Sequence, residues 1–302
     1  MKISVLMAIY KEPLGYIEDS INSTVKSLES FDYEFIIVVD NPNLSPVIED
    51  FLKKLDGNFI IHHNENNIGL ANSLNVAIDM ISGDYVMRMD ADDICHPDRV
   101  KKQLSYLNEN DDLCLIGSDI IKIDNSGNRV GVGISVKGKY NSIDLKCPIL
   151  YRTLCFHPTW FAKSEVFRKY KYNDLKTSQD LDFQFRLLQS GESIGNIPEK
   201  LLYYRISNES LSLKKGWEQT IIRYSLNSLF KSGEIINFVN LTNNINMFKS
   251  KKYLKKVFEK MHVKFIDALI NRHILTLIFC CLFSPMHFYK MILIIKSKLL
   301  GK

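Results

Sequence analysis

The chain has 302 residues, a formal net charge of +5 and an apolar fraction of 46%. This length accommodates one large globular domain or two smaller ones, and the composition is ordinary for a globular protein. Six cysteines occur without CxxC pairs, which argues against a disulfide framework or a zinc site and favours a reducing compartment. We expect no signal peptide, because the first apolar segment is short and is followed by Lys11 and Glu12.

The first hundred residues predict alternating strands and helices. Continuous apolar runs with β-branched members are typical of strands that are covered on both faces, and apolar side chains at helical spacing fill the segments between them. The predicted strands are residues 3–9, 35–39, 59–61 and 85–89, and the predicted helices are residues 13–30, 47–55 and 70–81. Four such alternations predict a parallel, doubly wound sheet.

Three acids follow the fourth predicted strand directly, in the order Asp90, Ala91, Asp92, Asp93. In an open α/β sheet, ligands bind at the carboxyl ends of the strands. Clustered carboxylates repel one another unless a cation neutralises them, and oxygen ligands at this density suit Mg²⁺ or Mn²⁺. An acidic turn that caps the following helix would explain the same residues.

Further polar residues follow the other predicted strands. Tyr10 and Glu12 come after the first strand, Asp40 after the second, and Asn67 and Gly69 in the loop after the third. Each has a structural explanation when it is taken alone. Because the ends of parallel strands share one edge of a sheet, however, their coincidence predicts a ligand site at that edge.

The second half of the predicted domain has a different pattern. Residues 113–123 and 129–135 predict two strands joined by the turn 124–128, so the alternation ends and the sheet becomes mixed. Residues 140–150 predict a helix. His157 lies in an apolar segment beside a proline, a setting that is more often structural than catalytic.

A helix is predicted from Ser178 to Ser190, with Asp180 and Asp182 in its first turn. Acids at a helix start interact favourably with the helix dipole, which explains both without a catalytic role. A carboxylate there is also well placed to act as a general base if it faces a pocket. Arg205 follows the strand 194–204, where it would suit a diphosphate or be an ordinary surface charge.

The chain from residue 216 onward is predicted to be helical, with residues 237–246 as an asparagine-rich linker. Residues 249–302 carry twelve basic residues and two acids, which indicates an anionic partner surface.

Residues 274–283 are apolar but too short to span a membrane. We favour a helix at residues 286–300 that lies in a membrane interface over one that packs on the body or on a second subunit, with nearby lysines reaching anionic headgroups: Lys290, Lys296, Lys298 and Lys302. No nucleic-acid-binding motif occurs, so nucleic acid is not an expected partner.

Over residues 1–212 the sequence resembles the family 2 glycosyltransferases, which have the GT-A fold. The resemblance lies in ordered segments: SVLMAIYKE, EFIIVVDN, NENNIGLANSLNVAI, DYVMRMDADDICHPDR, TSQDLDFQFRL and LLYYRISNESLS. It implies an α/β, Rossmann-like, mostly parallel central sheet with a mixed second half. The implied organisation is a nucleotide-binding half at about 1–110, an acceptor half at about 111–212, and a C-terminal helical region at 213–302.

The resemblance also assigns roles to single residues. It implies nucleotide-binding roles for Ala8, Tyr10, Glu12, Asp40, Asn67, Gly69, Asp90 and Ala91. It implies that Asp90 and Asp92 hold the metal and that Asp180 is the catalytic base. Further candidates for contact with the diphosphate or the acceptor are Asp93, His157, Gln179 and Arg205. The chain departs from the family where Gln179 replaces a glutamate, where Asn41 and Pro42 follow Asp40, and where Ala8 replaces a proline.

The implied reaction is inverting transfer of a sugar from a nucleotide-sugar donor, UDP by family habit, to a hydroxyl of a glycan or lipid-linked glycan. Mn²⁺ or Mg²⁺ is the implied cofactor, and a cytoplasmic, peripheral location at the inner membrane face is expected. A homo-oligomer is left open. Two alternatives also remain open. A nucleotidyltransferase would need a basic segment near the first strand, where only Lys11 occurs, and a non-catalytic sugar-nucleotide-binding protein is favoured only by Gln179.

Overall fold

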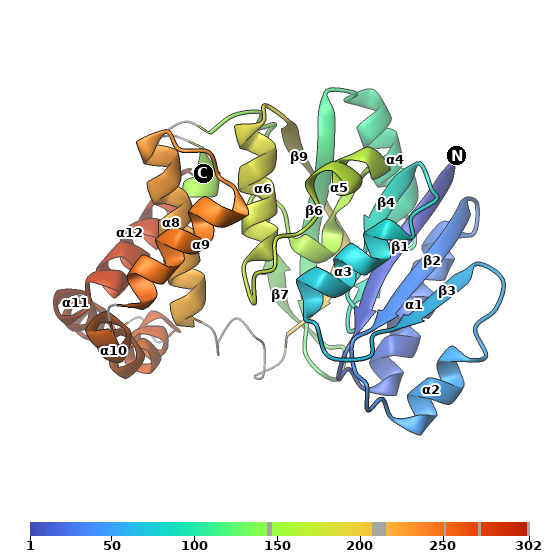
Figure 1. Ribbon diagram of the computed structural model, residues 1–302, viewed down its shortest axis with the longest axis horizontal. Helices are drawn as coiled ribbons and strands as arrows, with labels where there is room; N and C mark the ends of the chain where they lie inside the picture. The colour runs from blue at the N-terminus through green and yellow to red at the C-terminus, as the bar shows by residue number, and fades with distance from the viewer. Residues whose placement is uncertain (144–146, 207–215, 251, 271–272, 301–302) are drawn as a thin grey trace. The chain divides into compact units, whose positions relative to one another are not determined.

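The computed structural model describes residues 1–143, 147–206, 216–250, 252–270 and 273–300 (Figure 1). The chain divides into two compact units. One comprises Met1–Ser142 and Leu154–Ser207, and the other Ile143–Thr153 and Asn208–Lys302. The domain boundary predicted at residue 212 lies outside the described residues, as does most of the polar loop that begins after Arg205.

The first unit is built on a nine-stranded sheet with the order β3-β2-β1-β4-β8-β6-β9-β5, in which β7 pairs with β6. The first four strands are β1 (Lys2–Ile9), β2 (Asp32–Val39), β3 (Phe59–His63) and β4 (Tyr85–Arg88). All three pairings among them are parallel, as the alternation predicts. The register sets Ile9 beside Val39, so the residues that follow β1 and β2 are neighbours.

The remaining strands make the sheet mixed. They are β5 (Ile94–Cys95), β6 (Leu113–Ile123), β7 (Arg129–Gly133), β8 (Phe161–Lys163) and β9 (Ser193–Arg205). β6 and β7 form the predicted antiparallel hairpin, in which the Asp124 carboxylate accepts hydrogen bonds from the N–H groups of Ser126 and Asn128. β8 runs antiparallel to β4 and β6, whereas β9 runs parallel to β6.

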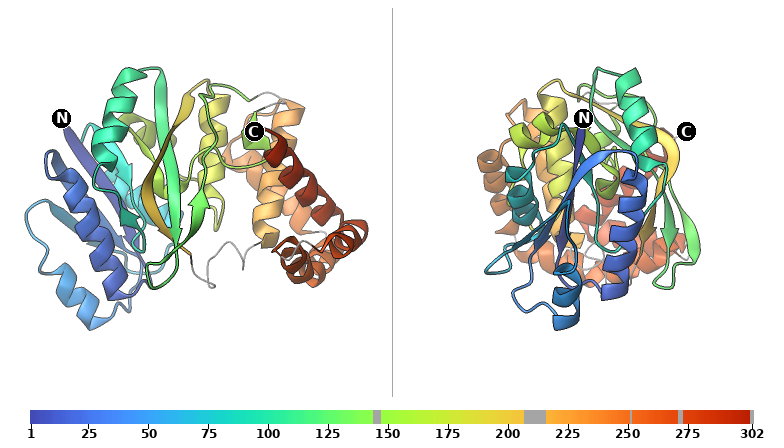
Figure 2. Two further views of the ribbon diagram at one scale, coloured as in Figure 1. Left: turned by 180° about the vertical axis from the view of Figure 1, so that it is seen from behind. Right: turned by 90° about the vertical axis from the view of Figure 1, so that its right-hand side faces the viewer.

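Helices cover both faces of this sheet. α1 (Leu14–Leu28) and α4 (Arg99–Glu109) pack together on one face, which is turned toward the viewer in the left view of Figure 2. α3 (Leu70–Asp79), α5 (Ser164–Tyr170) and α6 (Gln179–Gln189) cover the other, and α2 (Pro46–Leu52) connects β2 to β3. Because both faces are covered, the strands are apolar without alternation, and residues 35–38 are fully buried.

The prediction of a helix at residues 140–150 is wrong. Tyr140 instead forms an isolated bridge with Ile194, and the only described helical turn in this stretch is the 3₁₀ turn η1 (Pro148–Leu150). Residues 144–146 lie outside the described part. Pro148 explains the difference, because the residue before a proline is disfavoured in helical conformation and the proline itself can only begin a helix.

The linker predicted at residues 237–246 is also wrong, because this stretch forms most of α9 (Phe238–Lys249). Asn237 caps the helix with its side chain, which accepts a hydrogen bond of 2.9 Å from the backbone N–H of Asn240. Leu241, Ile245 and Phe248 recur at helical spacing and are buried. Their burial outweighs the low helix propensity of the asparagines between them.

The second unit contains α8 (Gly216–Ser232), α9, α10 (Lys252–Ile270), α11 (Ile274–Phe283) and α12 (Pro285–Leu300). α10, α11 and α12 contact one another, and α8 packs on α9 and α10. The η1 turn joins this unit through hydrogen bonds from Arg223 to the Ile149 carbonyl and from Asn227 to the Leu150 carbonyl. Among the described helices, none combines the length and apolar character that a membrane crossing requires.

Candidate active site

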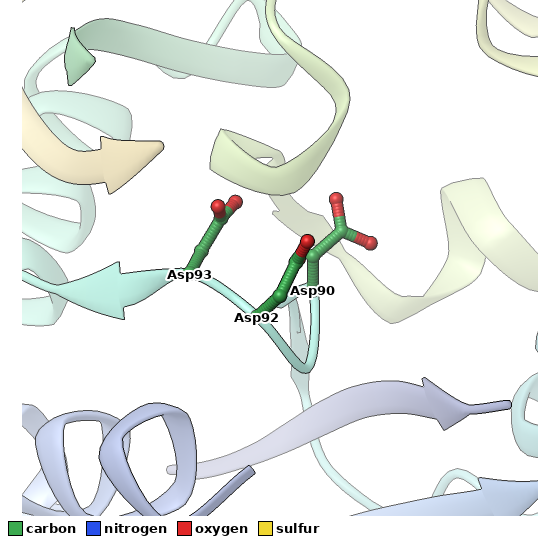
Figure 3. Close-up of side chains that lie close together, drawn as sticks. All are labelled: Asp90, Asp92 and Asp93. Atoms are coloured by element: carbon green, nitrogen blue, oxygen red, sulfur yellow. The ribbon is translucent and has the colours of Figure 1, made fainter. Parts of the chain in front are cut away.

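The acidic cluster lies in the loop between β4 and β5, at the carboxyl end of β4. Asp90, Asp92 and Asp93 each bring a carboxylate oxygen within 4.8 Å of the others. Figure 3 shows the three side chains projecting to the same side of the loop. The loop is anchored to α1, because the Ser20 hydroxyl donates a hydrogen bond of 2.8 Å to the Asp90 carbonyl. The predicted acidic residues therefore converge as one group.

Positive charge in the described surroundings only partly balances these carboxylates. The buried Arg88 guanidinium pairs with Asp90. Burial and the charges of Asp90 and Glu12 raise the pKa of Asp92 to about 7. Burial and the two neighbouring aspartates hold the pKa of Asp93 well above its ordinary value. Such shifts signal carboxylates that repel one another in a poorly solvated place.

The donor set fits a hard divalent cation. The Oδ2 atom of Asp93 is buried and has no hydrogen-bond partner in the described part of the chain. A cation would satisfy that oxygen and relieve the repulsion among the three carboxylates, and Mg²⁺ and Mn²⁺ prefer carboxylate oxygens.

Arg205 fixes the shape of the acidic loop from β9. Its backbone N–H donates to Asp93 Oδ1 at 2.8 Å, and its Nε donates to the Asp92 carbonyl at 2.8 Å. Its Nη1 donates to the carbonyls of Asp124 and Asn125, both at 3.1 Å. The sequence suggested a diphosphate contact or a surface charge. The surface-charge interpretation is wrong, because the side chain is buried and its donors engage backbone carbonyls, a role that the sequence did not predict. The diphosphate contact stays a prediction.

The end of β2 is tied to the loop that precedes α3. The Asp40 carboxylate is buried and accepts hydrogen bonds from the N–H groups of Ile68 at 2.8 Å and Gly69 at 2.9 Å. The Asn67 side chain donates to the Asp40 carbonyl at 3.0 Å. Gly69 has φ +85°, a conformation that favours glycine. The predicted residues Asp40, Asn67 and Gly69 are therefore in direct contact.

The end of β1 carries the remaining residues predicted for the nucleotide. Glu12 folds back so that its carboxylate accepts hydrogen bonds from the N–H groups of Tyr10 at 2.7 Å and Lys11 at 3.1 Å. Burial raises the pKa of Glu12, and the charge of Asp90 contributes in the same direction. The Tyr10 side chain is exposed, while Ala8 is half-buried on β1 and Ala91 is buried between the acids. Glu12 thus lies within electrostatic range of the acidic cluster.

Asp180 lies in the first turn of α6, next to Gln179, and both are half-buried. The Ser178 residue before them has φ +58°, and its side chain makes no capping hydrogen bond. Desolvation raises the pKa of Tyr204, and the charges of Asp90, Asp93, Asp92 and Asp180 add to this rise. The charges of Asp180 and of the acidic cluster therefore both act on the pKa of the same residue, Tyr204.

Asp182, in the same turn, has different surroundings. It is fully buried, and its Oδ2 accepts hydrogen bonds of 2.9 Å from both Arg186 and Asn173. His157, in the turn η2 (His157–Thr159), contacts the Tyr172 hydroxyl at 2.8 Å and meets the Trp160 ring edge-on. Desolvation and the positive charge of Arg88 hold the pKa of His157 well below its ordinary value. These contacts are typical of structural residues.

Arg88 was missed by the sequence predictions, although the sequence contains a signal for it. An arginine near the end of a buried apolar strand, two residues before an aspartate, needs a charged partner. The structure pairs it with Asp90.

A mixed α/β sheet with clustered acids at the carboxyl end of a central parallel strand places a ligand site at that edge, and comparisons with known proteins identify the family. Residues 4–170 match the family model described as Glycosyl transferase family 2. The protein described as "Uncharacterized glycosyltransferase MJ1057", from Methanocaldococcus jannaschii, is 36% identical over 74% of this chain and 77% of that protein. The chain belongs to glycosyl transferase family 2 and is a glycosyltransferase.

Two further comparisons bear on the family and the fold. The Escherichia coli O-antigen biosynthesis glycosyltransferase WbnJ is 31% identical over 79% of this chain and 92% of that protein. The crystal structure of S. aureus TarS 1-349 in complex with UDP aligns with a TM-score of 0.56 and 18% identity, covering 86% of this chain and 72% of that one. The predicted GT-A fold, with its mostly parallel sheet and mixed second half, is confirmed.

Proposed function

We propose that this glycosyltransferase moves a sugar from a nucleotide-sugar donor, with UDP as the favoured nucleotide, to a hydroxyl of a glycan or lipid-linked glycan, with inversion at the anomeric carbon. The observation that carries the proposal is the convergence of Asp90, Asp92 and Asp93 at the carboxyl end of β4. Because a diphosphate is itself negatively charged, it can lie beside these acids only if a cation lies between them.

The names of similar proteins support the choice of donor and acceptor. One TarS structure at 19% identity is described as a complex with UDP-GlcNAc. An Escherichia coli relative, 28% identical over 81% of this chain, is described as a UDP-Gal:alpha-D-GlcNAc-diphosphoundecaprenol beta-1,3-galactosyltransferase. These names describe a uridine nucleotide donor and, in the second protein, an acceptor on a lipid diphosphate. A cytoplasmic location at the inner membrane face would bring such an acceptor within reach.

Asp90 and Asp92 are the proposed metal ligands, with Asp93 beside them and Mg²⁺ or Mn²⁺ as the proposed ion. When bound, the ion would stabilise the negative charge that develops on the leaving nucleoside diphosphate. Arg205 keeps the Asp92 backbone and the Asp93 carboxylate in place, which preserves the geometry of the ligands.

The ends of β1 and β2 and the loop before α3 are the proposed nucleoside site, with Tyr10, Glu12 and Asp40 as its polar residues and Ala8, Asn67, Gly69 and Ala91 as its walls. Both carboxylate oxygens of Asp40 accept hydrogen bonds from the loop that holds Gly69. We therefore assign Asp40 the additional role of shaping this loop.

Asp180 is the proposed general base. It would accept the proton of the acceptor hydroxyl while the hydroxyl oxygen attacks the anomeric carbon on the side opposite the departing diphosphate. Asp182 is unsuited to this role, because it is fully buried and paired with Arg186. Gln179 cannot accept a proton at neutral pH, so it is not a candidate for the base and stays a candidate for contact with the diphosphate or the acceptor.

The experiment that tests the proposal compares Asp180→Asn with Asp50→Asn, an exposed aspartate on α2. Nucleoside diphosphate release is first screened with UDP-, GDP- and dTDP-sugars, with and without a chelator. We expect Asp180→Asn to bind the donor normally and to lose transfer by about 10²–10⁴-fold, whereas Asp50→Asn keeps wild-type rates. Near wild-type transfer by Asp180→Asn would disprove the base assignment, and full activity in chelator would disprove the metal assignment.

Family membership argues against both alternatives from the sequence, a nucleotidyltransferase and a non-catalytic binding protein. Release of pyrophosphate from a nucleoside triphosphate and a sugar phosphate, without nucleoside diphosphate release from any of the sugar nucleotides, would restore the first of them.

A further inference from the structure

Helix α11 exposes an apolar face. Its sequence, ILTLIFCCLF, contains no charged residue. Four apolar side chains on one side of the helix are strongly exposed, with Leu275 at 84% and Leu282 at 76%, together with Ile274 and Ile278. Cys280, on the opposite side, is fully buried. The exposed face is therefore a continuous apolar strip, which is unusual on the solvent-exposed surface of a monomeric protein.

The neighbouring helix α12 also exposes apolar side chains. Phe288 is 56% exposed and Ile295 is 50% exposed, and their seven-residue separation places them on the same side of α12. Because α11 and α12 pack against each other, apolar side chains of both helices belong to one part of the helical unit.

A row of lysines accompanies the strip. Lys252, Lys256, Lys260 and Lys264 recur every fourth residue on α10, and all four are exposed. Lys264 lies near α11, since its charge opposes the rise that desolvation causes in the pKa of Cys280. Lys290 and Lys296 add positive charge on α12. The side chain of Lys298 and the whole of Lys302 lie outside the part of the chain that the structure describes.

The length of α11 decides how it could meet a lipid bilayer. Ten residues make a helix of about 15 Å, half of the roughly 30 Å of a hydrocarbon core. Such a helix cannot cross the bilayer, but it can lie parallel to the membrane surface with its apolar side facing the lipid tails. Lysines beside that side would then meet anionic headgroups and strengthen the attraction to the surface.

We propose that the exposed face of α11, extended by Phe288 and Ile295, docks on the surface of a bilayer that contains anionic lipids, with the lysine row of α10 facing the headgroups. Charge complementarity selects this occupant, because neither a neutral lipid nor a purely apolar protein groove would use the lysine row. The proposal goes beyond the transfer reaction and rests on no step of it.

The test measures flotation of the full-length protein with phosphatidylglycerol-containing vesicles and with pure phosphatidylcholine vesicles. We expect wild-type protein to float with the anionic vesicles, and to float less as salt increases. The double variant Leu275→Asp/Leu282→Asp should bind at least about tenfold more weakly. Its control is Val47→Asp/Val239→Asp, which alters two exposed valines on α2 and α9 and should bind as wild type.

A second pair of variants tests the lysines. Lys256→Glu/Lys260→Glu should bind anionic vesicles at least about tenfold more weakly, whereas Lys53→Glu/Lys54→Glu, the same charge change beside α2, should leave binding unchanged. Circular dichroism and thermal unfolding establish that every variant is folded.

Three outcomes would overturn the proposal. They are absence of wild-type binding to anionic vesicles, equal binding by Leu275→Asp/Leu282→Asp, and a solution dimer that this double variant dissociates, which would assign the face to a second copy of the chain. Donor turnover without vesicles distinguishes the two proposals. If turnover persists while flotation fails, only the docking proposal is wrong.

Discussion

The two units of this chain use apolar residues in opposite ways. In the sheet unit, apolar runs such as residues 35–38 are completely buried, and function is concentrated in the polar residues at strand ends. In the helical unit, α11 is the most apolar described helix by sequence, yet it exposes five large apolar side chains. Apolar sequence therefore indicates a core in the first unit, whereas in the second unit it forms both a core, as at Leu226 and Phe265, and the exposed face of α11 that we propose as a docking surface. The difference becomes visible only when burial is known.

The largest effect is expected at the acidic cluster of the sheet unit. Asp92→Asn should lower nucleoside diphosphate release by about 10²–10³-fold, because one proposed metal ligand is lost. The same change should not lower the melting temperature in chelator, because it removes one of three mutually repelling carboxylates.

The control for this change is Asp98→Asn, which alters an exposed acid before α4 and should leave both quantities unchanged. Manganese titration of the purified protein gives a second measurement, with weaker binding expected for Asp92→Asn alone. Unchanged manganese affinity would remove Asp92 from the proposed ligands.

Arg205 should have the next largest effect, and on stability as well as activity. Arg205→Met removes the hydrogen bonds to the carbonyls of Asp92, Asp124 and Asn125, and leaves these groups without their buried donor. We expect the free energy of unfolding to fall by about 3 kcal/mol in urea denaturation. Arg205→Lys should recover only part of this loss of stability. The lysine keeps the positive charge, but it cannot reproduce the planar arrangement of donors that the guanidinium provides. Wild-type stability in Arg205→Met would show that the contacts are dispensable.

These residues also show how far the sequence could be read. Continuous apolar runs predicted the parallel strands correctly, because both faces of the sheet are covered and no alternation is needed. The convergence of Asp90, Asp92 and Asp93 followed from their place after β4. The partners of Arg205 were not predictable, because they lie about eighty and more than a hundred residues away along the chain, at contacts that no local pattern encodes.

The errors have local causes. The stretch 140–150 has helical spacing but contains Pro148, and the stretch 237–246 is rich in asparagine but keeps buried apolar residues four apart. In the first case backbone chemistry prevailed over periodicity, and in the second periodicity prevailed over propensity. The composition of α11 alone does not distinguish a buried helix from an interfacial one. The prediction of an interface in this region came from the basic residues around it.

Glu34 offers a pH-dependent test within the sheet unit. Burial raises the pKa of this carboxylate, but hydrogen bonds from Lys2, Ser4 and Ser82 outweigh it and lower the pKa to about 2. A folded-state pKa below the unfolded value of about 4.5 means that the stabilisation is present above that pH and is lost as the pH falls toward 2.

Glu34→Gln should therefore lower the free energy of unfolding by about 2 kcal/mol at pH 7. The difference from wild type should shrink as the pH falls below about 4.5. Denaturant titrations at several pH values measure it, with the exposed Glu29→Gln as the control that shows no such trend. A difference that stayed constant between pH 7 and pH 3 would mean that Glu34 is not charged in the folded protein.

The smallest effect is expected in the helical unit, where asparagines have opposite roles along α9. Asn237→Ala removes the side chain that accepts from the Asn240 N–H, so it should lower the stability of this unit by about 1 kcal/mol. Asn243→Ala, at an exposed position inside the same helix, should raise it by about 0.5 kcal/mol, because alanine has the higher helix propensity. Opposite signs, measured by thermal unfolding followed by circular dichroism at a helix wavelength, would identify Asn237 as a helix cap. Two changes of the same sign would mean that these asparagines act through something other than α9.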